Sequence, residues 1–152
     1  MFVEIFDRQF LDLHKRSCEL ILKIPEEKLY WEPGKANSLF PMNSCGECIL
    51  RSASAVEQTF GGITTRLWDD PFEWTLPETL STKEKILQYL EEVEQTRQRG
   101  FALFTSDEDL KKQIPAPVKL KPLFQILLET LARAEHFQGR AFAISQLLLD
   151  CK

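Results

Sequence analysis

The sequence contains few of the residues that metal binding, disulfide formation or nucleic-acid binding commonly requires. Its 152 residues include 2 histidines and 4 cysteines, and 19 Lys and Arg are outnumbered by 23 Asp and Glu, giving a formal net charge of −4. A protein that neutralises several phosphates needs a basic excess, so no binding to nucleic acid is expected. No apolar run approaches the roughly 18 residues of a membrane span, so no membrane association is expected either.

Sequence signatures of several enzyme classes are also missing. The chain has no G-x-S-x-G, no Walker motif, no H-E-x-x-H and no G-x-G-x-x-G. Serine nucleophiles, phosphate-cradling loops, zincin sites and dinucleotide binding therefore have no support. The first residues, Met1 to Glu4, show no positive segment followed by an apolar one, so a cytoplasmic location is expected.

The cysteines, at positions 18, 45, 48 and 151, are too few for a disulfide scaffold in a chain of this length. Cys45 and Cys48 form a C-x-x-C pair, but no second pair at zinc-finger spacing and no βαβ pattern accompanies it. Buried thiols that behave as small apolar side chains are favoured, and a redox or metal role is the alternative.

Four long stretches carry apolar residues at alternating steps of four and three, and none alternates strictly between apolar and polar residues. These stretches predict helices over residues 2–23, 43–67, 81–104 and 122–148. Phe60 and Leu127 occupy central positions of the second and fourth apolar stripes and are expected in the core. The third stripe contains one charged residue, Arg97.

Local signals refine these helices. Ser44 with Glu47, and Ser81 with Glu84, have the spacing of capping boxes at the starts of the second and third helices. The pair Gly61-Gly62 predicts a kink, close packing or the end of the second helix. Ser106 is expected to cap a short turn over residues 107–112, inside a loop over 105–120.

Four helices with one apolar stripe each can bury all four stripes together only as a bundle, with crossing angles of about 20°. Residues 1–152 are therefore expected to form a single all-α domain, because one core is sufficient for a chain of about 150 residues. Long loops are expected between the second and third helices, where a crossover is permitted, and between the third and fourth.

Aromatic residues gather near the second long loop and the end of the third helix. They are expected to cover one end of the bundle, with an exposed patch for self-association as the alternative. The residues concerned are Trp68, Phe72, Trp74, Phe101 and Phe104.

Three segments carry a resemblance to a known family. They are residues 24–34 (IPEEKLYWEPG), residues 44–50 (SCGECIL) at the start of the second helix, and residues 131–140 (LARAEHFQGR) in the fourth. Together they resemble the DinB-like superfamily of bacterial four-helix bundles, over essentially the whole chain. The resemblance implies a bundle fold and, as in many relatives, a homodimer.

The resemblance also implies where a metal would lie. Members of the superfamily often bind nickel or zinc through one histidine on the second helix and two histidines, four residues apart, on the fourth. Several of them use the metal to activate a small thiol for transfer or for maleylpyruvate isomerisation. Matching the motifs places Arg51, Arg133 and Phe137 at these three positions. Arginine offers no lone pair and phenylalanine has no donor atom, so the resemblance implies a member that has lost its metal triad.

Two functions follow for such a protein. The favoured one is a non-catalytic or ligand-binding protein, whose pocket at Arg51, Arg133 and Phe137 takes a small anionic or thiol ligand without a cofactor. The alternative is a metal- or thiol-dependent small-thiol transferase, either with a divalent nickel or zinc ion relocated to His136, Cys48 and Glu47 or with Cys48 itself in a chemical role.

The two arginines leave three interpretations open: an anion-binding cleft, structural ion pairs, or plain surface. Glu47 precedes Arg51 by four residues, and Glu129 precedes Arg133 by the same spacing, so either arginine could form a helical ion pair. The apolar stripe of the second helix points almost opposite to Arg51, which favours a solvated arginine.

Overall fold

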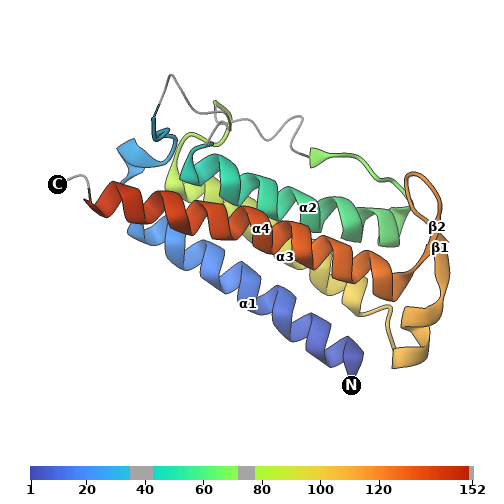
Figure 1. Ribbon diagram of the computed structural model, residues 1–152. Helices are drawn as coiled ribbons and strands as arrows, with labels where there is room; N and C mark the ends of the chain where they lie inside the picture. Colours follow the sequence, from blue (N-terminus) through green and yellow to red (C-terminus); the bar gives the residue numbers. More distant parts are fainter. Residues whose placement is uncertain (35–42, 72–77, 151–152) are drawn as a thin grey trace.

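The computed structural model describes residues 1–34, 43–71 and 78–150, and within them the chain forms four α-helices that lie side by side (Figure 1). They are α1 (Phe2–Lys23), α2 (Cys45–Thr65), α3 (Lys83–Phe101) and α4 (Leu123–Asp150). The predicted all-α class is confirmed in the sense that the structure is mainly helical. None of the described helices combines the length and apolar character needed to cross a membrane.

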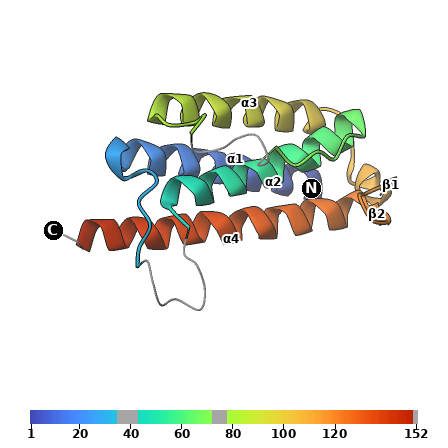
Figure 2. The same cartoon turned by 90° about the horizontal axis from the view of Figure 1, so that it is seen from above.

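The order of the helices in space differs from their order along the chain. Both α1 and α2 pack against α3 and against α4, and the contact between α2 and α4 is the most extensive. In Figures 1 and 2, α1 and α4 run in one direction and α2 and α3 in the other. The end of α2 and the start of α3 therefore lie at opposite ends of the helices.

Capping side chains explain where the helices begin. The Ser44 hydroxyl accepts a hydrogen bond from the Glu47 backbone N–H, as the sequence predicts for α2. The third helix is capped by Thr82, which accepts from the Lys85 N–H, so the predicted cap at Ser81 is wrong by one residue. Lys85 rather than Glu or Gln stands three residues after Thr82, so Thr82 lacks the capping-box pattern that pointed to Ser81.

The first turn of α1 is capped from a distant part of the chain. The Asp107 carboxylate accepts hydrogen bonds from the backbone N–H groups of Val3 and Phe2, and these bonds lower the pKa of Asp107 to about 2. Asp107 begins the short 3₁₀ helix η3 (Asp107–Lys111), which corresponds to the predicted turn. A second 3₁₀ helix, η1 (Glu26–Lys28), follows α1 and has no counterpart in the sequence prediction.

A small antiparallel hairpin lies between η3 and α4, where the sequence predicts only loop. Strands β1 (Gln113–Pro115) and β2 (Leu120–Pro122) pair with Ile114 opposite Lys121. Each strand has three residues, which is too short to display the alternation by which strands are recognised. The hairpin is a correction to the purely helical prediction, and it closes one end of the α2–α4 contact (Figure 1).

The core is built from the predicted apolar stripes. Phe60 and Leu127 are fully buried, which confirms their predicted place. Rings of Phe10, Phe60 and Phe101 pack together with centroids 5.3 to 5.9 Å apart. Phe104 and Trp68 also pack against the core, in agreement with an aromatic cover, whereas Phe72 and Trp74 lie outside the described residues.

The glycine pair in α2 is explained by close packing near the end of the helix. A Cβ atom at Gly62 would lie 2.3 Å from the Trp68 ring, whereas one at Gly61 would meet only the Leu67 carbonyl oxygen at 3.6 Å. The helix ends at Thr65, two residues before its predicted end, and Arg66 takes a left-handed conformation with φ of 63°. The absence of a side chain at Gly62 thereby leaves room for the Trp68 ring.

Candidate functional site

A cleft of about 90 Å³ lies between α2 and α4 and contains all three positions assigned to the metal ligands by the resemblance. Its α4 wall is formed by Arg133 and Phe137, which are four residues apart and share one face of the helix. The other lining residues are Arg51, Ser54, Ala55 and Gln58 from α2, followed by Asp70.

Arg51 faces this cleft although the main apolar stripe of α2 points elsewhere. Because α2 packs against both α3 and α4, it buries two faces, and the second face carries Arg51, Ser54, Ala55 and Gln58. The small side chains of Ser54 and Ala55 leave room beside the arginine. The expectation that Arg51 is simply solvated is therefore wrong: its side chain is 34% exposed and lines a cavity.

The Arg51 guanidinium has two neighbours that hold its position. Its Nη2 lies 3.2 Å from Oε1 of Glu47, one turn earlier, which confirms the predicted helical ion pair. Its central carbon also lies 5.9 Å from the centre of the Phe137 ring, at the distance of a cation–π contact. Two interpretations of Arg51, ion pair and cleft residue, are thus compatible.

Arg133 lies at the mouth of the cleft and is exposed. Its Nη2 donates a long hydrogen bond, 3.4 Å, to Oε1 of Gln58. The predicted pair with Glu129 is wrong, because Glu129 bonds to Lys121 Nζ at 2.6 Å, and this bond lowers the pKa of the Glu129 carboxyl. Within the described part of the chain, no carboxylate lies within ion-pair distance of Arg133.

The cleft offers two cations to a ligand, and of these Arg133 is the one without an ion pair among the described residues. The described lining contains two guanidinium groups and one carboxylate, that of Asp70, while Glu47, outside the lining, pairs with Arg51. Guanidinium groups bind carboxylates and phosphates in a bidentate manner, which gives strength and direction to the contact. The polar side chains of Ser54 and Gln58 complete a wall suited to a small oxyanion.

The same side chains do not fit a divalent metal. Arg51 and Arg133 have no lone pair to donate, and the Phe137 ring has no donor atom. At these three positions the nickel or zinc site of the family therefore has no ligands, and no metal chemistry is derived from them.

The residues of the relocated metal hypothesis are not brought together around this cleft. Cys48 is fully buried, and burial raises the pKa of its thiol. His136 is exposed and meets the Phe137 ring edge-on, while Glu47 pairs with Arg51. Over the described ranges, no three His, Cys, Asp or Glu side chains are grouped so as to hold a metal ion.

The C-x-x-C pair lies at the start of α2 as two buried thiols. Both Cys45 and Cys48 are fully buried, and burial raises the pKa of Cys45 to about 12. A thiol at that pKa stays protonated near neutral pH and is a poor nucleophile. The predicted burial of Cys45 and Cys48 is confirmed, while Cys151 lies outside the described residues.

A second, larger cavity of about 310 Å³ adjoins the first, and sequence reasoning missed it. The two cavities share Gln58 and Arg133. Its outer wall is formed by Ala116, Pro117 and Val118, from the turn of the hairpin. Since the hairpin itself has no clear sequence signal, this wall could not be predicted.

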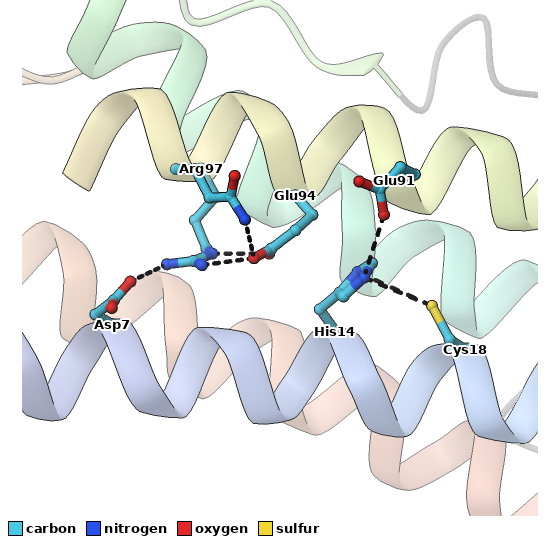
Figure 3. Close-up of polar contacts among 7 residues, drawn as sticks. Asp7, His14, Cys18, Glu91, Glu94 and Arg97 are labelled. Atoms are coloured by element: carbon cyan, nitrogen blue, oxygen red, sulfur yellow. Dashed lines mark hydrogen bonds and ion pairs between the residues drawn. The ribbon is translucent and has the colours of Figure 1, made fainter. Parts of the chain in front are cut away.

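A polar cluster between α1 and α3 was also missed (Figure 3). Arg97 of α3 is buried and donates hydrogen bonds to both carboxylate oxygens of Glu94, at 2.8 and 2.6 Å, and a further one to Asp7 of α1. The sequence signal for this cluster was Arg97 itself, a charged residue on the apolar stripe of the third helix, with Glu94 one turn before it. Burial alone would lower the pKa of Arg97, but these hydrogen bonds outweigh it and raise that pKa.

His14 and Cys18 lie beside this network, and their chemistry is restrained by their surroundings. Nε2 of His14 lies 3.8 Å from Sγ of Cys18 and 3.8 Å from Oε2 of Glu91 (Figure 3). Burial, followed by the charges of Glu91, Glu94 and Glu19, raises the pKa of the Cys18 thiol. The thiol therefore remains protonated, and we interpret the cluster as a link between α1 and α3 rather than a nucleophilic site.

Comparison with known proteins adds no relative to this description. No protein-family model matches the chain, and no curated protein is significantly similar to it. The function is therefore inferred from the geometry of the cleft and from the motifs of the sequence.

Proposed function

We propose that this protein is a DinB-like four-helix bundle that binds a small anion between Arg51 and Arg133, without a catalytic metal. One observation carries the proposal. Three positions that the motifs select from distant parts of the sequence, Arg51, Arg133 and Phe137, line a single cleft between α2 and α4. Two of the three are arginines, so a positive charge is kept where relatives hold a dication.

The contacts in the cleft support a binding role for these arginines. Glu47 and Phe137 orient Arg51, and Gln58 orients Arg133. An oxyanion between the two guanidinium groups would gain charge-assisted hydrogen bonds at a partly desolvated site, where such bonds are stronger than in bulk water. The volume of about 90 Å³ suits a group as small as a carboxylate or a phosphate.

The lining does not support catalysis at this cleft. It contains neither histidine nor cysteine among the described residues, and the Ser54 hydroxyl donates to the Arg51 carbonyl oxygen at 3.1 Å. A serine nucleophile needs a base within hydrogen-bond reach. We therefore favour a binding protein over the thiol transferase, for which the buried Cys48 and the exposed His136 offer no common site.

Thermal unfolding in the presence of small anions tests the proposal. Acetate or phosphate should raise the melting temperature, because a ligand at a hundredfold excess over Kd stabilises the folded state by about 2.7 kcal/mol. The double substitution Arg51→Gln and Arg133→Gln should abolish that rise without unfolding the protein. A matched control is Arg8→Gln with Arg99→Gln, two exposed arginines on α1 and α3, which should keep the rise.

The proposal fails if neither anion changes the melting temperature, or if the double variant in the cleft responds as the parent does. The metal-dependent alternative has its own test. Protein purified without a histidine tag should contain well under one equivalent of nickel or zinc, and one tightly bound equivalent would restore the relocated site at His136, Cys48 and Glu47.

The homodimer stays a prediction. Phe2 of α1 and Phe124 of α4 are 46% and 38% exposed and contact each other edge-on, with ring centres 5.7 Å apart. Exposed aromatic side chains of this kind are common in interfaces. They support self-association without identifying the partner surface.

A further inference from the structure

The two cavities between α2 and α4 are neighbours that share two lining residues, Gln58 and Arg133. Gln58 lines both of them and uses both ends of its amide there: its Nε2 donates to the Trp68 carbonyl oxygen at 3.0 Å, and its Oε1 accepts from Arg133. Gln58 thus links Trp68, which lines the larger cavity, to Arg133, which lines both cavities. A ligand at the arginines would have the larger cavity directly beside it.

The larger cavity has mainly apolar walls. Trp68, Val118 and Ile126 line it, together with Ala116 and Pro117 of the hairpin turn. Its remaining charged residues away from Arg133 are Lys121 and Glu129, which neutralise each other in the ion pair at 2.6 Å. Beyond the shared arginine, the described lining of this cavity therefore carries no net charge.

The polar groups in this cavity's lining need no partner from a ligand. Oγ1 atoms of Thr59 and Thr130 lie 2.6 Å apart, and the Thr130 hydroxyl donates to the Ile126 carbonyl oxygen at 2.8 Å. Thr59 must then be the donor to Thr130, so both hydroxyl hydrogens are used within the protein. An apolar group can contact this part of the lining without leaving a buried donor unsatisfied.

We propose that the ligand is an amphiphilic carboxylate, with its acid group between Arg51 and Arg133 and its apolar part in the larger cavity. This inference rests on the proposed anion site and adds the chemical class of the ligand. The cationic end of about 90 Å³ fixes the head, and the adjoining cavity of about 310 Å³ accommodates an aryl or alkyl chain.

Calorimetric titration with three probes tests the inference. Acetate carries the head alone, 4-phenylbutyrate carries head and tail, and 4-phenylbutan-1-ol carries the tail with a neutral head. 4-Phenylbutyrate should bind at least about tenfold more tightly than acetate, because burying each methylene group strengthens binding about fourfold. The alcohol should bind at least about tenfold more weakly than 4-phenylbutyrate, because it lacks the charge that the arginines pair with.

A substitution in the hairpin separates the two ends of the site. Ala116→Phe places a ring in the larger cavity and should weaken the binding of 4-phenylbutyrate at least about tenfold. The affinity for acetate should change by less than about twofold. The matched control is Leu120→Phe, in the same hairpin, where the side chain is 61% exposed and does not line the cavity. The control should bind all three probes as the parent does.

The outcomes distinguish this inference from the proposed function. If acetate binds through the arginines but 4-phenylbutyrate gains nothing, or if Ala116→Phe leaves its affinity unchanged, the amphiphilic ligand is wrong and the anion site stands. Equal affinity for the acid and the alcohol would also overturn the inference, because the arginines would then play no part. If no carboxylate binds, the amphiphilic ligand is wrong, and the anion site fails with it only if phosphate does not bind either.

Discussion

The α1–α3 contact and the α2–α4 contact both contain arginines, but these arginines differ in their burial and in the free volume beside them. Arg97, between α1 and α3, is 3% exposed, and the cavity beside it is only about 20 Å³, the size of one water molecule. Arg133, between α2 and α4, is exposed and lies where cavities of about 90 and 310 Å³ meet.

The comparison shows what distinguishes a structural arginine from a candidate binding arginine. Arg97 donates hydrogen bonds to both carboxylate oxygens of Glu94 and to one of Asp7, so each of its three guanidinium nitrogens already has a carboxylate partner (Figure 3). Arg133 makes one long hydrogen bond to a neutral amide and has open space beside it. Arg51 of the cleft also has a carboxylate partner, Glu47, so free volume beside the guanidinium groups, rather than the presence of an arginine, distinguishes the region that can take a ligand.

Removing each arginine should separate the two regions most strongly. Arg97→Met leaves the carboxylate of Glu94 buried without its cation, and breaking a buried pair in this way costs about 3–5 kcal/mol of folding free energy. Arg133→Met should change that free energy by no more than about 0.5 kcal/mol, because the side chain is exposed. Chemical denaturation of both variants measures the difference.

A double variant isolates the cost of the unpaired carboxylate. Adding Glu94→Gln to Arg97→Met removes the unpaired charge and should recover part of the lost stability, since the isolated carboxylate is the main penalty. If Arg97→Met and Arg133→Met lower the free energy of unfolding equally, Arg97 contributes no more to stability than the exposed Arg133, and the distinction between the two regions is wrong.

The glycine pair of α2 tests how firmly the wall of the larger cavity is held. A Cβ atom at Gly62 would collide with the Trp68 ring, so Gly62→Ala should destabilise the protein by about 1–3 kcal/mol. Gly61→Ala, one residue away, meets no such obstacle and should be neutral or stabilise the helix by up to about 1 kcal/mol. Equal effects in denaturant titration would show that Trp68 is not fixed by Gly62.

Thiol reactivity gives the smallest expected effect, because the prediction is an absence of reaction. In a Cys151→Ser background, Cys45 and Cys48 should resist a disulfide reagent in the folded protein at a pH of about 8, since burial raises both thiol pKa values. All remaining cysteines should react once denaturant is added. Rapid modification of Cys48 in the native state would revive a chemical role for that residue.

Much of the helical framework could be predicted, because its helices are long and periodic. The bounds of α1 coincide with the prediction, and α4 extends only two residues beyond its predicted end. The hairpin β1–β2 could not be predicted, because strands of three residues show no period. The end of α3 was placed three residues too late, at Phe104, which packs on the core from outside the helix.

The site was predictable only where a motif marked it. Arg51, Arg133 and Phe137 were selected by a resemblance, but the direction of Arg51 was misjudged because one apolar stripe was considered on a helix that buries two faces. The larger cavity depends on Ala116 and Val118, residues without a recognisable pattern. Tertiary packing, which joins a hairpin turn to two helices, supplied what the local sequence could not.

Anomalous diffraction from crystals soaked in selenate would show directly whether an oxyanion binds between Arg51 and Arg133. Selenate is an oxyanion similar in charge and shape to phosphate, and its selenium can be located without ambiguity. We expect one strong peak between the guanidinium groups of Arg51 and Arg133, within hydrogen-bond distance of both, and no peak there in the Arg51→Gln, Arg133→Gln variant. A cleft without selenium in crystals whose cleft is open to solvent would contradict the account.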